Sequence, residues 1–183
     1  ESQIVGQLKE SWQMAHESGG VGKVLDRLFQ HAFATGKRIR SKTRIGEHSV
    51  SVAYTTVMLA KQIFGDLKSK TVILVGAGDM VELCGRHLHD KGLSSLIIAN
   101  RSLERATALA DQFGAHAVAL AELPSVLHKA DILISSTASQ EPVIYPKSVK
   151  LALKQRRNQP MFLVDIAVPR DIHPGVGKLD NVY

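Results

Sequence analysis

The sequence contains a single cysteine, Cys84, so an internal disulfide is excluded. This cysteine and the eight histidines show no spacing that would hold zinc, so no metal site is predicted. No apolar run approaches the length of a membrane span, and the N-terminal residues have neither the basic start nor the apolar centre of a signal peptide. These absences predict a cytoplasmic protein with no membrane partner.

What is present is the composition of an ordinary globular protein. The 183 residues are 44% hydrophobic and 22% charged, and this length suffices for one full core and a partial second one. The net charge of +6 would suit an acidic partner such as nucleic acid, although many basic proteins bind none. Lys and Arg are concentrated at residues 37–44, which fits a solvated connector at least as well as a phosphate-binding patch, and no aromatic residue is interleaved to stack on bases.

The most informative stretch is 71–81. Residues 71–75 form an apolar, β-branched run that is typical of a strand buried on both faces of a parallel sheet. Gly76 then permits a sharp strand-to-helix turn, and Gly78 lets a pyrophosphate approach the first N–H groups of the next helix. Val81 replaces the third glycine of the dinucleotide-binding motif, where it would push the helix slightly off the strand. The alternative is an ordinary turn between a strand and a helix.

Strand and helix patterns alternate from residue 71 onward. This order predicts an α/β fold with a Rossmann-like, doubly wound parallel sheet. The predicted strands are 71–75, 96–99, 116–120, 132–135 and 161–164, with a sixth beginning at 181–183. The predicted helices are 80–91, 103–113, 121–129 and 146–157.

The section before this alternation is predicted to be helical. Apolar residues at helical spacing predict one helix near the N-terminus, a second that Gly36 ends, and a third over 49–64. The first two helices have no strand to pack on. Residues 1–46 are therefore expected to be the last helices and basic connector of a domain that begins before Glu1, and 47–183 to be the dinucleotide-binding domain.

The end of the second strand indicates which dinucleotide binds. An NAD site would place Asp or Glu there to accept hydrogen bonds from the ribose 2′-OH, but this chain has Asn100, Arg101 and Ser102. A carboxylate would repel a 2′-phosphate, whereas a guanidinium binds it and a hydroxyl adds a further bond. The pattern predicts NADP. Arg105, one turn further on, either adds to the binding of the 2′-phosphate or is a surface residue without a role in binding.

Small polar residues follow the fourth strand, and Ser136, Thr137 and Ala138 would leave room for a flat nicotinamide ring. The segment 165–171 follows the fifth strand, and both segments are nearly as well explained as plain polar turns. Cys84 has no histidine beside it in the sequence and lies within the helix after the glycine turn. A buried packing thiol is the favoured interpretation, ahead of a nucleophile.

Seven segments resemble the glutamyl-tRNA reductase family, in the family's order and most closely its bacterial members: 1–7, 36–40, 49–53, 75–78, 98–102, 135–138 and 165–171. The resemblance implies an enzyme whose cysteine thiolate attacks glutamyl-tRNA, after which NADPH reduces the thioester to glutamate-1-semialdehyde for tetrapyrrole (porphyrin) biosynthesis. It also implies that the nucleophilic cysteine lies upstream of Glu1, so this chain holds no catalytic residue and is inactive alone. A helical domain after Tyr183 would form the homodimer, and the aminomutase that acts next is a candidate partner.

The resemblance also implies site residues. The glutamate-recognition segment falls on Glu1, Ser2 and Gln3, with Gln7 one turn further along the helix. The 2′-phosphate contacts fall on residues 100–102. The phosphate-binding loop falls on Gly76, Ala77, Gly78, Asp79, Met80 and Val81.

Two alternatives from other classes remain open. One is a shikimate-dehydrogenase-like NADP oxidoreductase, which would need a Lys/Asp pair in a preceding substrate domain. The other is a dinucleotide-sensing module without chemistry. A reading frame that adds a cysteine-bearing domain before Glu1 and a helical domain after Tyr183 would favour the reductase.

Overall fold

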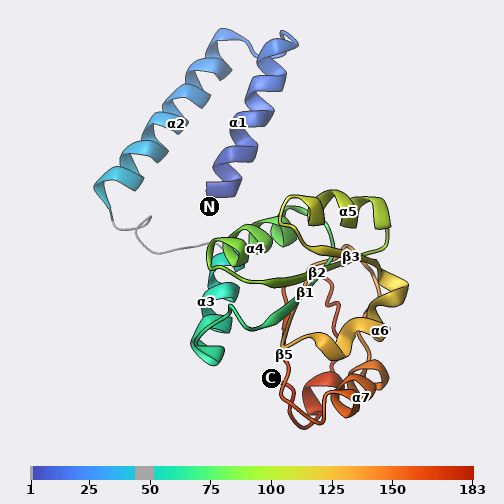
Figure 1. Cartoon of the computed structure of the whole chain (residues 1–183). Helices are drawn as coiled ribbons and strands as arrows, with labels where there is room; N and C mark the ends of the chain where they lie inside the picture. Colours follow the sequence, from blue (N-terminus) through green and yellow to red (C-terminus); the bar gives the residue numbers. More distant parts are fainter. Residues whose placement is uncertain (1, 44–51) are drawn as a thin grey trace. The chain divides into compact units, whose positions relative to one another are not determined.

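A computed structural model of the chain describes residues 2–43 and 52–183, with only the backbone of residues 2 and 3 (Figure 1). The chain divides into two compact units, Glu1–Val50 and Ser51–Tyr183. Glu1, Arg44, the predicted helical residues 49–51 and the predicted boundary after residue 46 lie outside the described residues.

The first unit is a helical hairpin of α1 (Ser2–Glu17) and α2 (Lys23–Lys42). The Trp12 side chain joins the two helices, because its Nε1 donates to Asp26 Oδ1 at 3.0 Å and its ring lies edge-on to Phe33 at 6.0 Å between centroids. None of the residues of α2 is buried within the described structure. The hairpin is therefore stabilised by contacts between one face of α1 and one face of α2.

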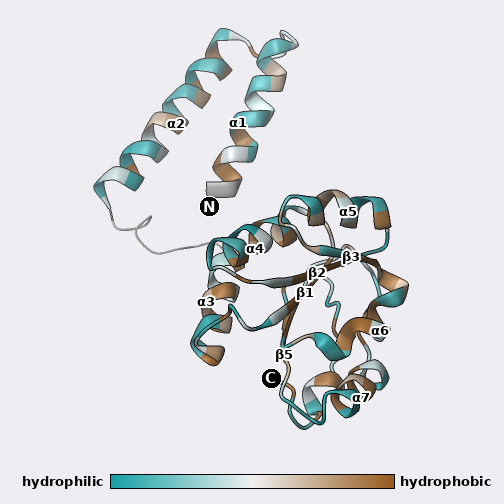
Figure 2. Cartoon of the chain, in the orientation of Figure 1, coloured by the Kyte–Doolittle hydropathy of each residue, from teal (hydrophilic) through white to brown (hydrophobic). Residues whose placement is uncertain are grey.

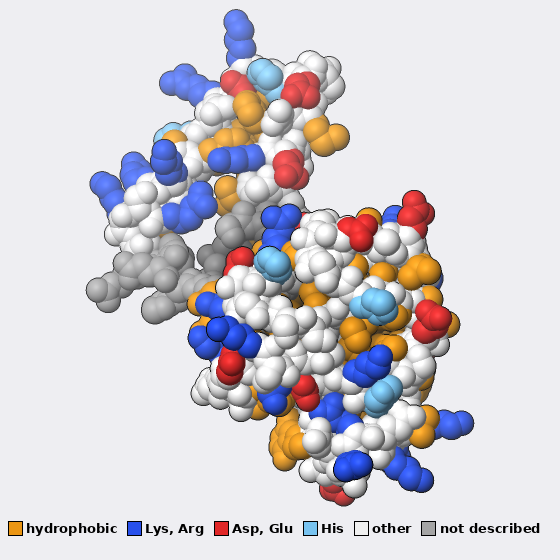
Figure 3. All heavy atoms as spheres, viewed as in Figure 1, with side chains coloured by type: hydrophobic (Ala, Val, Ile, Leu, Met, Phe, Trp, Pro, Cys, Tyr) orange, Lys and Arg blue, Asp and Glu red, His pale blue; other side chains and the backbone are white. Residues whose placement is uncertain are grey.

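The prediction that Gly36 ends the second helix is wrong. Gly36 does not adopt the left-handed conformation that would stop the helix, and α2 continues to Lys42. A glycine within a helix costs only about 1 kcal/mol, and the Lys, Arg and Ile residues that follow favour helix. The basic residues from 37 to 42 therefore extend α2 instead of forming a connector. Figure 3 shows Lys and Arg side chains gathered on the surface of this unit.

The second unit contains a five-stranded sheet in which every pairing is parallel. Its strands are β1 (Thr71–Val75), β2 (Ser95–Asn100), β3 (His116–Ala119), β4 (Ile132–Ser135) and β5 (Phe162–Asp165). Their order is β3-β2-β1-β4-β5. The predicted sixth strand is present only as an isolated bridge between Met161 and Val182.

Helices cover both faces of this sheet, so the predicted doubly wound α/β fold is confirmed (Figure 1). One face packs against α3 (Val52–Phe64), α4 (Asp79–Asp90) and α5 (Leu103–Asp111). The other packs against α6 (Leu123–Val126), its flanking turns η2 (Leu120–Glu122) and η3 (Leu127–Lys129), α7 (Pro146–Gln155) and η4 (Val176–Lys178). The predicted helix 121–129 is thus split into short pieces, and Pro124 is the second residue of α6.

The two hydrophobic cores explain why the strands are continuously apolar. Along β1, Val72 and Leu74 face the first core, whereas Ile73 and Val75 face the second, and all four are fully buried. Figure 2 shows hydrophobic residues along the strands and on the inner sides of the helices. Both faces of each strand must therefore be apolar, which is the pattern of a covered parallel sheet.

The strand order defines where a ligand would bind. The chain proceeds from β1 through β2 to β3 in one direction, and then returns to place β4 on the other side of β1. Such a reversal leaves a crevice outside the carboxyl ends of the two strands beside it, here β1 and β4. The glycine turn follows β1 directly and therefore lies at this point.

Candidate functional site

Gly76 makes the sharp turn after β1. Its φ is +113°, and a Cβ at this position would lie 2.3 Å from the backbone oxygen of Ser136 and 3.2 Å from Cγ2 of Val81. A side chain here would be strained by the backbone conformation and would collide with the turn after β4. The sequence prediction that Gly76 allows the turn is confirmed.

Gly78 differs from Gly76, because its backbone is extended and a Cβ would meet no atom within 4 Å. Gly78 is the N-cap of α4, and no side chain caps the first N–H groups of that helix. Gly78 and Asp79 are exposed, while Ala77 and Met80 are half-buried. The N-terminus of α4 thus faces open space, as an anion-binding helix end requires.

Val81 is fully buried and packs over Gly76. It takes the place of the third glycine of the motif without filling the space at Gly78. Gly85, one turn further along α4, is a second position where a side chain would collide with its surroundings, because a Cβ there would stand 2.7 Å from the Phe113 ring. Sequence inspection missed Gly85, because nothing in the local pattern indicates which aromatic ring lies above it.

In the turn after β2, two polar side chains form hydrogen bonds within the turn, and one cationic side chain is available to a ligand. The Asn100 side chain donates from Nδ2 to the Ser102 carbonyl oxygen at 3.1 Å, and Ser102 Oγ accepts from the Arg105 backbone N–H at 3.3 Å. Asn100 and Ser102 therefore shape the turn and cap α5. The Arg101 side chain is exposed, and no carboxylate within residues 2–43 and 52–183 forms an ion pair with it. Its guanidinium is available for an anionic ligand.

The turn after β4 is held by a buried carboxylate. Asp171 is fully buried, and its Oδ2 accepts from Ser135 Oγ at 2.6 Å and from the Thr137 backbone N–H at 2.7 Å, while its Oδ1 accepts from Thr137 Oγ1. Asp171 was predicted as part of the segment 165–171 after the fifth strand, but its contact with this turn was not predicted. The contact joins residues 34 and 36 positions apart, which no local spacing can indicate.

The structure brings three of the predicted segments to one edge of the sheet. In the strand register Val75 of β1 is level with Ala99 of β2 and with Ser135 of β4. The segments 76–81, 100–102 and 136–138 therefore follow neighbouring strand ends. The remaining predicted residues belong to the first unit, where Gln7 is exposed on α1 and residues 2 and 3 lie in its first turn.

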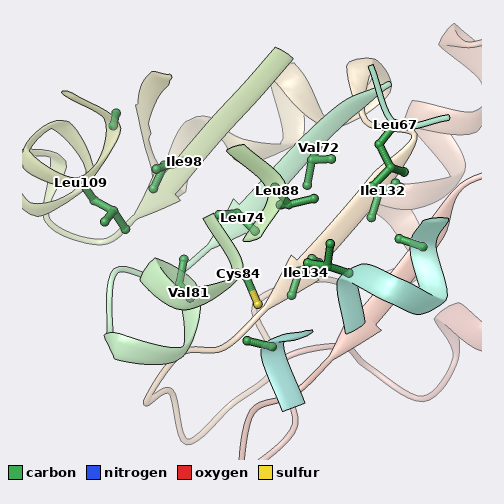
Figure 4. Close-up of a cluster of buried hydrophobic side chains, with 14 of the residues drawn as sticks. Leu67, Val72, Leu74, Val81, Cys84, Leu88, Ile98, Leu109, Ile132 and Ile134 are labelled. Atoms are coloured by element: carbon green, nitrogen blue, oxygen red, sulfur yellow. The ribbon is translucent and has the colours of Figure 1, made fainter. Parts of the chain in front are cut away.

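Cys84 is fully buried, and burial raises the pKa of its thiol to about 12. Figure 4 shows its sulfur pointing into the cluster of apolar side chains between α4 and the sheet. The prediction of a buried packing thiol is confirmed. Within the described parts of the chain, no three His, Cys, Asp or Glu side chains gather in a way that could hold a metal ion. None of the helices described is long and apolar enough to cross a membrane.

The raised pKa of Cys84 predicts an inert thiol. Burial keeps this thiol protonated at pH 8, and the thiolate is the form that alkylating reagents attack. We expect iodoacetamide to leave the folded chain unlabelled under conditions that label the urea-unfolded chain fully, as measured by mass spectrometry. Rapid labelling of the folded chain would contradict this placement of the sulfur.

Two family models match this chain. Residues 58–183 match the Shikimate / quinate 5-dehydrogenase model, and residues 1–43 match the Glutamyl-tRNAGlu reductase N-terminal domain model. The first match, together with the glycine turn at the switch point of the sheet, defines residues 58–183 as a dinucleotide-binding domain of the shikimate / quinate 5-dehydrogenase family.

Comparisons over the whole length give a narrower result. The glutamyl-tRNA reductases of Ectopseudomonas mendocina and Pseudomonas aeruginosa are 55% identical to all 183 residues, which span 43% of each relative. The solved glutamyl-tRNA reductase of Methanopyrus kandleri matches 100% of this chain and 46% of its own, with 38% identity and a TM-score of 0.69. The chain belongs to the glutamyl-tRNA reductase family, as its motifs predicted.

A second solved structure supports the fold alone. The nucleotide-binding domain of glutamyl-tRNA reductase from Thermoplasma volcanium is 17% identical, with a TM-score of 0.53 over 73% of this chain and 86% of its own. The chain spans less than half the length of the curated relatives that it matches.

Proposed function

We propose that this chain is the NADPH-binding portion of a cytoplasmic glutamyl-tRNA reductase. The whole enzyme would reduce glutamyl-tRNA, through a thioester on a cysteine outside this chain, to glutamate-1-semialdehyde for porphyrin biosynthesis. The observation that carries the proposal is the open N-terminus of α4 at Gly78 after β1, together with the exposed Arg101 after the neighbouring strand β2. Whole-chain similarity to glutamyl-tRNA reductases supports the choice of reaction.

The fit of the cofactor to these residues follows from the order of the strands. The backbone N–H groups of residues 79 and 80 would bind the pyrophosphate, since the space beside Gly78 is empty. Arg101 would bind the 2′-phosphate at the end of β2, and residues 136–138 would lie beside the nicotinamide at the end of β4. NADPH, when bound, supplies the hydride.

The first unit would contribute to substrate recognition. A Glu1 carboxylate would pair with the α-ammonium group of the glutamyl ester, and the side chains of Ser2, Gln3 and Gln7 would hydrogen-bond to the same group. The match of residues 1–43 to the reductase N-terminal domain model supports this assignment. Homodimerisation through a further helical domain, and contact with the aminomutase that consumes the aldehyde, belong to the same proposal.

A second candidate is a shikimate-dehydrogenase-like oxidoreductase, which the family match over residues 58–183 favours. The two candidates share the cofactor site and differ in substrate. Oxidation of shikimate by the longer protein with NADP, without reduction of glutamyl-tRNA, would support the second candidate.

Replacement of Arg101 tests the choice of cofactor. We expect Arg101→Ala to remove most of a preference for NADPH over NADH, because one charge-assisted contact to the 2′-phosphate is lost. Such a contact is worth on the order of 1.5–3 kcal/mol, about ten- to a hundredfold in affinity. Fluorescence titration with both cofactors measures the change.

Arg86→Ala is the matched control for charge, since Arg86 is also exposed but pairs with Glu82 on α4. It should leave the preference intact. An unchanged NADPH preference in Arg101→Ala would place the 2′-phosphate elsewhere.

Replacement of Cys84 tests the location of the nucleophile. Cys84→Ala in the longer enzyme should retain turnover, because this thiol is buried and protonated. The 183-residue chain alone should make no glutamate-1-semialdehyde from glutamyl-tRNA and NADPH. Loss of turnover in a folded Cys84→Ala enzyme, or aldehyde formed by the chain alone, would contradict the proposal.

A further inference from the structure

Asp171 is a buried carboxylate without a cationic partner. It is 0% exposed, and within the described residues no Lys, Arg or His forms an ion pair with it. A carboxylate is expensive to bury unless hydrogen bonds replace its hydration. Here the replacement comes from Ser135 and Thr137, which donate two hydroxyl bonds and one backbone N–H bond. The whole compensation therefore comes from the last residue of β4 and the turn that follows it.

This turn lies against the glycine turn. Between the two residues that Asp171 holds is Ser136, whose backbone N–H donates to the Val75 carbonyl oxygen at 2.9 Å. The Ser136 carbonyl oxygen stands 2.3 Å from the position a Cβ would take on Gly76. The Thr137 hydroxyl also accepts from the Ser139 N–H at 3.1 Å, so the order extends to the next residues. A displaced Thr137 would therefore displace the backbone beside the glycine turn.

The backbone around Asp171 is itself fixed. The N–H groups of Val143 and Ile144 both donate to the Asp171 carbonyl oxygen, at 2.8 and 3.0 Å. Asp165, at the end of β5, accepts from the Ala167 N–H at 3.1 Å and from the Ile172 N–H at 2.9 Å. These bonds fold the segment 165–172 back toward β4. The Asp171 side chain thus reaches the turn from a fixed point.

The turn after β4 lies where the nicotinamide half of a bound dinucleotide would extend. With the adenylate half at the end of β2 and the pyrophosphate at the end of β1, the other half extends over the end of β4. We propose that Asp171 is a positioning residue for the nicotinamide half of the cofactor, acting through the backbone of residues 135–137. This inference rests on the proposed function, and it assigns to Asp171 no role at the adenylate half.

Binding of two ligands distinguishes a positioning role of Asp171 from a general effect of Asp171 on stability. NADPH would contact the ends of β2, β1 and β4, whereas adenosine 2′,5′-bisphosphate carries only the adenylate half with its 2′-phosphate. For Asp171→Ala we expect the Kd for NADPH to rise about tenfold or more and the Kd for adenosine 2′,5′-bisphosphate to change less than about twofold. Asp171→Asn should fall between, because its amide oxygen can still accept from the Thr137 N–H.

Asp131→Ala is the matched control. Its carboxylate also accepts a backbone bond, from the Thr71 N–H at 3.0 Å, and pairs with the buried Arg156 side chain at 2.7 Å, so its loss lowers stability from the opposite edge of the sheet. At a temperature where circular dichroism shows all variants folded, Asp131→Ala should bind both ligands like the unaltered chain. If Asp171→Ala does not fold, Thr137→Val, which removes one hydroxyl, should show the same split with a smaller rise in the NADPH Kd.

The outcomes are distinct. Equal weakening of both ligands by the Asp171 and Thr137 variants, or unchanged NADPH binding in them, would overturn the positioning role. Failure of the unaltered chain to bind either ligand would instead overturn the proposed function.

Discussion

A Gly78→Val variant is expected to fold like the unaltered chain and to bind no NADPH. The backbone at Gly78 is extended, with φ −102° and ψ 176°, and its Cβ direction is empty, so valine can be accommodated in the folded protein. Valine is a poorer N-cap than glycine, by up to about 1 kcal/mol. Its branched side chain would however occupy the space that the pyrophosphate needs, so the Kd should rise roughly a hundredfold or more.

Gly76→Ala is the contrasting variant. It lies two residues away, but its Cβ would collide with the Ser136 backbone in a left-handed conformation, so we expect a loss of stability instead of a selective loss of binding. Urea unfolding and a cofactor titration on each variant distinguish the two results. Normal NADPH binding by folded Gly78→Val would mean that the pyrophosphate does not lie at the N-terminus of α4.

An Arg156→Ala variant is expected to lose about 3–5 kcal/mol of unfolding free energy, the usual penalty for breaking a buried ion pair. The Arg156 side chain is 5% exposed, and its Nη2 donates to Asp131 Oδ1 at 2.7 Å. All five guanidinium N–H groups have acceptors, which otherwise are backbone oxygens of residues 128, 130, 159 and 160. Removal of the side chain leaves the Asp131 carboxylate and these four backbone oxygens without the hydrogen bonds that Arg156 donated.

Lys154→Ala is the control for this variant, because Lys154 is exposed in the last turn of α7, two residues before Arg156, the C-cap residue of that helix. It should change the unfolding free energy by no more than about 0.5 kcal/mol. Urea unfolding followed by circular dichroism gives both values. Equal stability of the Arg156 and Lys154 variants would show that the buried network is not needed.

The sequence predicts the sheet well, because each strand is covered on both faces. Strands such as β1 and β4 are therefore short apolar runs with a distinct beginning and end. The glycine turn was also predictable, since Gly76 and Gly78 follow β1 at once and each has a separate physical reason. Residues 37–42 were not, because a single glycine stops a helix only when it adopts the left-handed conformation, and Gly36 does not.

The polar contacts behind the site were beyond sequence reasoning. Asp171 meets Ser135 across 36 positions, and Arg156 meets Asp131 across 25. Periodicity reports which face of an element is buried, but it carries no information on which loops meet at the edges of a sheet. Arg101, in contrast, was predictable from the sequence. It is exposed and directly follows the second strand, so its place in the order of elements was enough to assign it to the cofactor site.

Direct titration of the unaltered 183-residue chain with NADPH and with NADH measures whether this chain is an NADPH-binding domain. We expect saturable binding of NADPH at one site per chain and an affinity for NADH about ten- to a hundredfold weaker, because NADH lacks the 2′-phosphate that Arg101 would bind. Equal affinity for the two cofactors, or no binding of either by the folded chain, would contradict this expectation.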